Sequence, residues 1–181
     1  LAFLALVIDL PKDIDRIKLV KMAILHDVGE SIIGDCVCDM GTFFNREKYS
    51  IKNKEEQKAI QQIFSDSTYD DSKQLVLEFL EHKSKDAQLL KELDKIEMLL
   101  QAIAYEKVVT PGQLDDFWAS SKRYLKSSNL IALYDCLLKC KKQGITESND
   151  FNLKLLNQPN KLKVTAKSSW ALKDVQNPQL E

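Results

Sequence analysis

The stretch that decides the fold is Lys21-Met-Ala-Ile-Leu-His-Asp-Val-Gly-Glu-Ser-Ile-Ile-Gly-Asp35. On a helix, two neighbouring rows of this stretch carry ionisable groups inside apolar lines: Met22, His26, Glu30, Ile33 and Ala23, Asp27, Glu30, Gly34. Burying an unpaired charge is costly. We therefore expect these groups to bind one another, a metal ion or a substrate.

The chain around this stretch reads as one helix after another. The pattern predicts helices over residues 1–10, 13–33 (as one helix or two), 54–64, 72–82, 86–105, 115–125 and 130–141, with a loop over 36–53. The clearest is 86–105, whose apolar residues form one stripe: Leu89, Leu93, Ile96, Leu100 and Ile103. Proline or glycine follows several of these segments and stops the helix there. The sequence thus predicts an all-α fold, a helical bundle.

The character of the chain changes near Gly144. Residues 145–181 are rich in Asn, Gln, Ser and Lys and have few apolar positions. Such a segment buries too little apolar surface to repay the entropy of ordering. We expect one domain over residues 1–143 and a flexible or loosely docked polar tail over 144–181.

Composition excludes several classes of protein. The 181 residues carry 26 Lys and Arg against 27 Asp and Glu, a net charge of −1, which does not suit a protein held on nucleic acid by bulk positive charge. The longest clean apolar run, residues 1–8, is far short of the ~20 residues of a membrane span. No glycine-rich phosphate loop is present.

Cysteine usage points to a location inside the cell. Cys36, Cys38, Cys136 and Cys140 lack the paired spacing of a zinc knuckle. We expect reduced, partly buried thiols in an intracellular, cytoplasmic protein, with a redox or zinc pair as the alternative.

The residue types in the deciding stretch suit a divalent metal ion. His26 and Asp27 are adjacent, so on a helix their side chains diverge by ~100° and an ion fits between them. Imidazole and carboxylate together suit Mn, Co, Fe, Zn or Mg. Glu30 lies one turn further on, where it can exchange a proton with water or a leaving group. Asp94 is the best candidate for a further carboxylate, and Asp35 follows the helix-ending Gly34 at the mouth of the same site.

Simpler interpretations compete with this one. A His-Asp pair on a helix is commonly a satisfied surface or core pair, and an isolated Asp94 is commonly solvated. The residues beside Asp94, Lys95 and Glu97, are expected to be more exposed than it is. His82 is expected at an exposed helix end.

Two blocks together resemble a known family. Ala23-Ile-Leu-His26-Asp27-Val-Gly-Glu30-Ser-Ile-Ile-Gly-Asp35 and Lys91-Glu-Leu-Asp94-Lys-Ile-Glu-Met-Leu-Leu-Gln-Ala102 are similar to the HD-domain phosphohydrolases, and more narrowly to their 5′-deoxynucleotidase branch. The resemblance covers roughly residues 1–140 and implies an all-helical bundle. It also implies metal ligation by His26, Asp27 and Asp94, with Glu30 and Asp35 assisting proton transfer.

The resemblance further implies a reaction and a partner. The reaction is hydrolysis of a deoxyribonucleoside 5′-monophosphate to nucleoside and phosphate, with a divalent metal ion as cofactor, and members of this branch are usually homodimers. The family pattern also has a histidine ligand and a phosphate-holding arginine that would fall upstream of Leu1. We therefore expect an N-terminally incomplete version of a longer protein, with a degenerate member as the alternative.

Two other functions compete with the nucleotidase. One is another HD-type phosphohydrolase, acting on a cyclic nucleotide or a guanosine polyphosphate. The other is a non-catalytic helical module that dimerises through its bundle.

Overall fold

The computed structural model describes residues 1–35, 39–40, 43–106 and 108–144 of the chain. Within these ranges the α-helices are α1 (Ala2–Val7), α2 (Arg16–Leu25), α3 (Glu30–Ile33), α4 (Arg46–Ile63), α5 (Asp70–Glu81), α6 (Lys85–Tyr105), α7 (Asp115–Lys122) and α8 (Ser128–Lys142). A short 3-10 turn, η1, covers Ser67–Tyr69, and two-residue strands β1 (Asp39–Met40) and β2 (Phe43–Phe44) pair antiparallel. The all-α prediction is confirmed.

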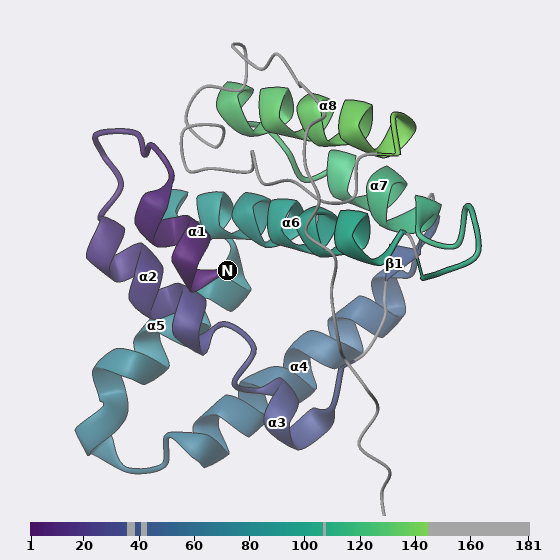
Figure 1. Cartoon of the computed structure of the whole chain (residues 1–181). Coiled ribbons are helices and arrows are strands. Elements are labelled where there is room, and N and C mark those ends of the chain that lie inside the picture. The colour runs from purple at the N-terminus through teal and green to yellow at the C-terminus, as the bar shows by residue number, and fades with distance from the viewer. Residues whose placement is uncertain (36–38, 41–42, 107, 145–181) are drawn as a thin grey trace, which may run out of the picture.

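Helix α6 is the centre of the bundle. It contacts α1, α2 and α5 on one side and α7 and α8 on the other, and Figure 1 shows it running between these groups. Its predicted stripe faces this core, with Leu93 and Ile96 almost completely buried and Leu100 partly buried. Helix α6 is therefore the scaffold from which any side chain at Asp94 is presented.

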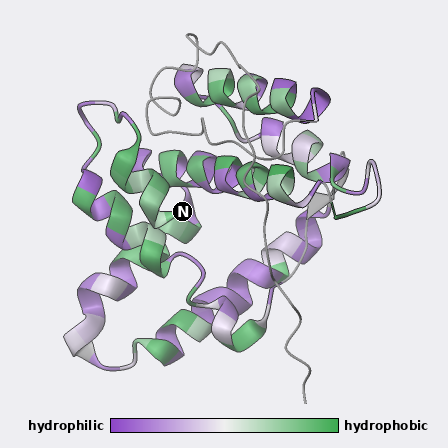
Figure 2. Cartoon of the chain, in the orientation of Figure 1, coloured by the Kyte–Doolittle hydropathy of each residue, from purple (hydrophilic) through white to green (hydrophobic). Residues whose placement is uncertain are grey.

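Helices α3 and α4 lie below this core in Figure 1, where α4 runs beside α3 and on to α5. Figure 2 shows that α4 is largely hydrophilic, whereas α1 and α2 are mostly apolar. A second, smaller apolar cluster joins α4 to α5 through Ile60, Phe64, Val76 and Leu80. Helix α4 thus brings a largely hydrophilic element beside a bundle whose interior is apolar.

Side-chain caps explain where three helices begin. Asp15 accepts hydrogen bonds from the N–H groups of Ile17 and Lys18, so α2 starts at Arg16. Asn45 caps α4 by accepting from the N–H of Lys48 at 2.9 Å, and Ser84 caps α6.

One prediction about local structure is wrong, and another concerns residues that mostly lie outside the described ranges. Residues 46–53 were expected to be loop, but they form the first half of α4, because the Asn45 cap starts a helix whose exposed face is charged rather than periodic. The domain boundary at residue 143 stays a prediction, because residues 145–181, which hold nearly all of the predicted tail, lie outside the described residues.

Candidate active site

The deciding stretch is not one continuous helix. Helix α2 ends at Leu25 with His26 as its C-cap, and α3 begins only at Glu30. Between them the chain keeps helical dihedrals but tightens, with the N–H of Val28 donating to Leu25 at 3.0 Å and that of Glu30 to Asp27 at 3.0 Å. The straight rows assumed from the sequence are therefore broken at the two residues that matter most.

His26 is held by two acceptors. Its Nδ1–H donates to the Ala23 carbonyl at 2.8 Å, and its Nε2 lies 2.7 Å from Oδ2 of Asp27. Burial lowers the pKa of His26, but the Asp27 carboxylate, Asp94 and the Ala23 carbonyl outweigh burial and raise the pKa above its usual value. These two contacts fix the orientation of the ring, with Nε2 directed at a carboxylate. The hydrogen bond at the other nitrogen, Nδ1, sets the tautomer.

Asp94 lies on the neighbouring face of α6 and carries two lysine partners. Its Oδ2 is 3.3 Å from Nζ of Lys91 and 3.2 Å from Nζ of Lys95. Burial raises the pKa of Asp94, but the two ammonium groups more than offset this and, with His26, hold the pKa below its usual value. Asp94 is therefore an ionised carboxylate within electrostatic reach of His26.

Glu30 and Asp35 meet a lysine from α4. Nζ of Lys52 lies 2.7 Å from Oε1 of Glu30 and 3.9 Å from Oδ1 of Asp35. Burial lowers the pKa of Lys52, but Glu30, with Glu56 and Asp35, raises it above the usual value. Two carboxylates predicted to act in proton transfer thus share one cation.

Glu56, on α4, lies beside this part of the site. It is buried on α4, and a Cβ on Gly29 would lie only 2.7 Å from its Cγ, so only glycine fits there without a shift. Burial raises the pKa of Glu56, with Glu30 and Asp27 adding to the rise and Lys52 and Lys91 opposing it. The pKa of this carboxylate therefore depends on charged groups from α3, α4 and α6 together.

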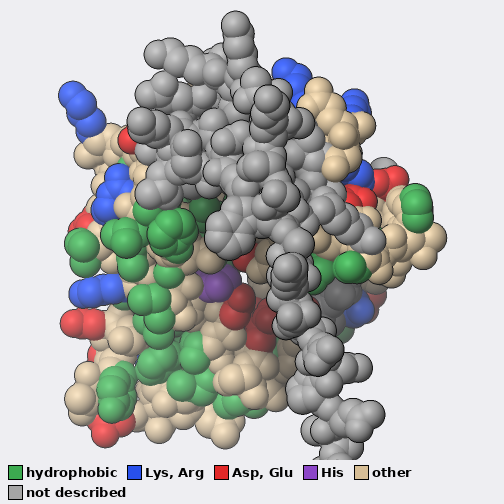
Figure 3. All heavy atoms as spheres, in the orientation of Figure 1, with side chains coloured by type: hydrophobic (Ala, Val, Ile, Leu, Met, Phe, Trp, Pro, Cys, Tyr) green, Lys and Arg blue, Asp and Glu red, His purple; other side chains and the backbone are tan. Residues whose placement is uncertain are grey.

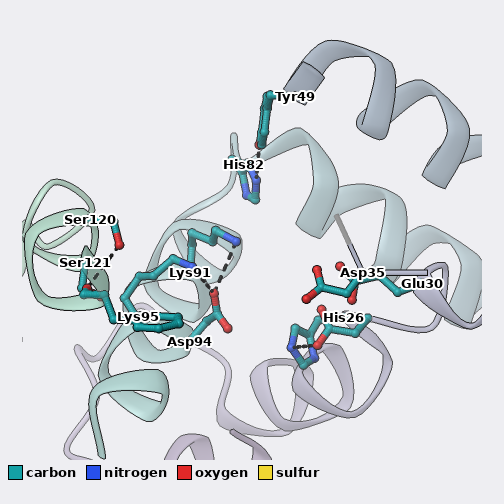
Figure 4. Close-up of polar contacts among 12 residues, drawn as sticks. His26, Glu30, Asp35, Tyr49, His82, Lys91, Asp94, Lys95, Ser120 and Ser121 are labelled. Carbon is teal, nitrogen blue, oxygen red and sulfur yellow. Dashed lines mark hydrogen bonds and ion pairs between the residues drawn. The ribbon is translucent and has the colours of Figure 1, made fainter. Parts of the chain in front are cut away.

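The predicted site residues gather in one region without forming a closed cage. Figure 4 shows His26, Glu30 and Asp35 facing Asp94 and Lys91 across an open space, with His82 and Tyr49 at its far edge. Figure 3 shows histidine and acidic side chains beside a hollow on this face. Within the described part of the chain, no three His, Cys, Asp or Glu side chains are close enough to hold a metal ion. His26 and Asp27 are in contact, and the three-ligand set with Asp94 stays a prediction.

Several residues of the site carry no clear signal in the sequence. Lys52 falls in the segment expected to be loop, and Lys95 was expected to be exposed but is half-buried against the ring of Tyr124. His82, expected at an exposed end, is half-buried with a left-handed backbone, and its Nε2 lies 3.3 Å from the Tyr49 hydroxyl. Of these contacts, only the Lys91–Asp94 ion pair could have been predicted from the sequence, because the two residues are three positions apart on a helix.

Phe79 links the two histidines. Its buried ring lies edge-on to His26 at 5.7 Å between centroids and to His82 at 5.3 Å, and the Lys91 ammonium lies 5.6 Å from its centroid. One apolar side chain therefore lies between the groups from α2 and those from α6 and contacts both.

The family described as HD domain matches residues 1–130, the part of the chain that carries both motif blocks. The chain belongs to the HD domain family. In this HD-domain protein the paired His26 and Asp27 stand at the junction of α2 and α3, and Asp94 stands on α6.

Similar curated proteins share one name. The chain is 37% identical over 108 residues to "5'-deoxynucleotidase HDDC2" of Dictyostelium discoideum, covering 58% of this chain and 53% of that protein. It is 27% identical over 138 residues to the Xenopus laevis protein of that name, covering 76% of this chain and 68% of the relative. For the Homo sapiens protein the identity is 29% over 121 residues, 66% of this chain and 58% of the relative. The chain thus spans about half to two thirds of the relatives it matches.

The described helices give no sign of a membrane span. Among them, none combines the length and the apolar character needed to cross a bilayer.

Proposed function

We propose that this HD-domain protein is a divalent-metal-dependent phosphomonoesterase that hydrolyses deoxyribonucleoside 5′-monophosphates. The observation that carries the proposal is the contact between His26 and Asp27 at the α2–α3 junction, opposite the ionised Asp94. The match to the HD domain family and the shared name of the relatives support the same reaction class.

The donor set suits a divalent cation of the Mn, Co, Mg, Fe or Zn type. The Ala23 carbonyl occupies Nδ1–H of His26, so Nε2 is the nitrogen left to bind a cation. Asp27 supplies an oxygen 2.7 Å from Nε2, and Asp94 supplies the second carboxylate. We propose these three residues as the ligands. A bound cation supplies Lewis-acid polarisation of the phosphoryl group and of the attacking water.

The remaining acids are proposed to move protons. Glu30 accepts the proton that the attacking water loses as its oxygen bonds to phosphorus. The P–O5′ bond breaks, and the proton taken up by Glu30 passes to the leaving oxygen, directly or through Asp35. Lys52, at 2.7 Å, holds the Glu30 carboxylate in place during both steps. Product is then nucleoside and inorganic phosphate.

Phosphate release tests the proposal directly. The full chain is incubated with deoxyribonucleoside and ribonucleoside monophosphates, a cyclic nucleotide and a guanosine polyphosphate, each with added Mn²⁺ or Co²⁺ or with a chelator. We expect phosphate from the deoxyribonucleoside monophosphates with metal and none with chelator. Asp27→Asn should abolish release, whereas Glu55→Gln, an exposed acid on α4, should not change it.

Other outcomes would redirect the proposal. Cleavage of the diester or polyphosphate alone would place the protein in another HD-type branch. Absence of release from every substrate, in a chain that elemental analysis shows to carry metal, would refute the phosphomonoesterase.

We also propose that the protein is intracellular and acts as a homodimer on a free nucleotide. The free thiols of Cys136 and Cys140 support the location. Exposed apolar side chains on α1 and α2, including Phe3, Leu6 and Ile24, support an interface between copies. Light scattering should give twice the monomer mass, and a monomer mass would contradict the dimer.

A further inference from the structure

We propose that Lys91 is the side chain that binds the phosphate group of the substrate. The inference rests on the proposed phosphomonoesterase and extends it, because none of the carboxylates named above can bind a dianion directly. Glu30, Asp35 and Asp94 bring negative charge to the open space of Figure 4, and Asp27 adds a further carboxylate in contact with His26. A phosphate dianion enters such a space only where cations offset these carboxylates.

Among the described residues, three lysines pair with these acids, and their exposure separates them. The side chain of Lys91 is 28% exposed, against 18% for Lys95 and 17% for Lys52. Lys52 is bound tightly to Glu30 at 2.7 Å. Lys91 and Lys95 each place an ammonium near an aromatic ring, at 5.6 Å from the Phe79 centroid and 5.4 Å from the Tyr124 centroid, so exposure is what separates these two. Lys91 is therefore the lysine that a ligand reaches most easily.

Lys91 can also leave its present partner at low cost. It shares Oδ2 of Asp94 with Lys95, so when Lys91 moves away the carboxylate still has an ammonium at 3.2 Å. A buried carboxylate that loses its sole partner is strongly destabilised, whereas one that keeps a second partner is not. Lys52 lacks this freedom, because it is the ammonium that pairs closely, at 2.7 Å, with the half-buried Glu30.

The surroundings of Lys91 place it beside the reacting groups. Its ammonium and the ring of His26 both lie within 6 Å of the Phe79 centroid, at 5.6 and 5.7 Å. His82, whose ring also contacts Phe79, lies within electrostatic reach of Lys91, Asp94 and Lys95. Burial and Lys91 lower the pKa of His82 to about 4, so the imidazole is neutral near pH 7. A phosphate held by Lys91 thus lies between the α2–α3 junction and α6.

Binding of inorganic phosphate tests the assignment without turnover. Titration calorimetry of the full chain, with Mn²⁺ present, compares wild type with Lys91→Met, Lys91→Arg and Lys95→Met. Lys95→Met is the matched control, because it removes an ion pair to the same oxygen of Asp94 at nearly the same distance. We expect Lys91→Met to weaken phosphate binding at least tenfold, Lys91→Arg to restore most of the affinity, and Lys95→Met to change it less than threefold.

A second comparison separates phosphate recognition from nucleoside recognition. Binding of dAMP should weaken in Lys91→Met as phosphate does, and binding of deoxyadenosine should stay the same. Equal weakening in the Lys91 and Lys95 variants would mean that the lysines act only through Asp94, and would overturn the inference. Phosphate affinity unchanged in Lys91→Met, or no phosphate binding by wild type, would overturn it as well.

The two proposals fail in distinguishable ways. A wild-type chain that binds phosphate through Lys91 but releases none from any monophosphate refutes the enzymatic proposal and leaves this one intact. A chain that hydrolyses monophosphates and whose Lys91→Met variant binds phosphate normally refutes only the role of Lys91.

Discussion

Two carboxylates on α6 lie two positions apart and have opposite surroundings. Glu92 faces α8 and is only 5% exposed. Its Oε2 accepts from the N–H groups of Lys126 and Ser127 at 2.7 and 2.8 Å, and its Oε1 accepts from the Ser127 hydroxyl at 2.9 Å. Asp94 faces the open space, is 22% exposed, and is paired with two lysine ammonium groups.

The difference separates a structural acid from a candidate ligand. The partners of Glu92 are groups fixed at the start of α8, so the carboxylate completes the fold through three hydrogen bonds. The partners of Asp94 are the ends of long, flexible side chains, which a cation can replace. The kind of partner, rather than the depth of burial, distinguishes the two roles.

The strongest test of this comparison is Asp94→Asn. The amide keeps the shape but loses the charge that a divalent cation requires, so we expect phosphate release to fall at least a hundredfold, equivalent to about 2.7 kcal/mol of transition-state stabilisation. Thermal unfolding without metal should change little, because the lysines become solvated. Release assays and a melting curve on the same sample check both. Full activity in Asp94→Asn would remove Asp94 from the ligand set.

Glu92→Ala should have the reverse profile. It leaves two backbone N–H groups at the start of α8 without their acceptor, and we expect a loss of about 2–3 kcal/mol in the free energy of unfolding by urea. Glu92→Gln should recover most of this, because its carbonyl can accept from the N–H groups while the Ser127 hydroxyl turns to accept from the amide. A fall in activity per folded molecule in Glu92→Gln would contradict the purely structural role assigned to Glu92.

Metal addition should sharpen the comparison further. A ligand present at a hundred times its dissociation constant stabilises the folded state by about 2.7 kcal/mol. We expect Mn²⁺ to raise the melting temperature of wild type and of Glu92→Gln and to leave Asp94→Asn unchanged. Chelator should reverse the shift. An equal shift in all three proteins would mean that the cation binds elsewhere.

The smallest expected effect concerns His82, next to Asp94. Its pKa of about 4 in the folded chain lies below the ordinary 6.5, because burial and Lys91 disfavour the charged ring. The unfolded chain therefore binds more protons between these values, so stability is full above pH 6.5 and falls as pH drops toward 4. After discounting for partial exposure, we expect His82→Gln to remove roughly 1–2 kcal/mol of this loss. Urea unfolding at pH 7.5 and 4.5 measures it, and equal pH dependence in the two proteins would contradict the buried neutral ring.

The sequence predicts the helices better than the site. Periodicity located α6 to within one residue at its start, because a long apolar stripe fixes one face of a helix. It missed residues 46–53 of α4, whose charged surface has no period to detect. It left residues 13–33 open as one helix or two, but its rows of side chains ran through His26 and Asp27, where the chain tightens.

Long-range pairing explains the rest of the difference. His26 and Asp27 were singled out by their types, and their direct contact agrees with the expectation that such groups bind one another. Lys52 and Glu30 are 22 positions apart, and no local pattern announces that their side chains meet at 2.7 Å. The sequence indicates Asp94 through its place beside an apolar stripe. It does not predict that two lysine side chains pair with Asp94 and change the charge around it.

Gly29 sets the separation between two layers of the molecule. A methyl group there would lie 2.7 Å from Cγ of Glu56, and the backbone at Gly29 is otherwise ordinary for any residue. Alanine at this position would require the Glu56 side chain or the turn before α3 to shift. The close approach of this turn to α4 thus depends on the absence of a side chain at residue 29.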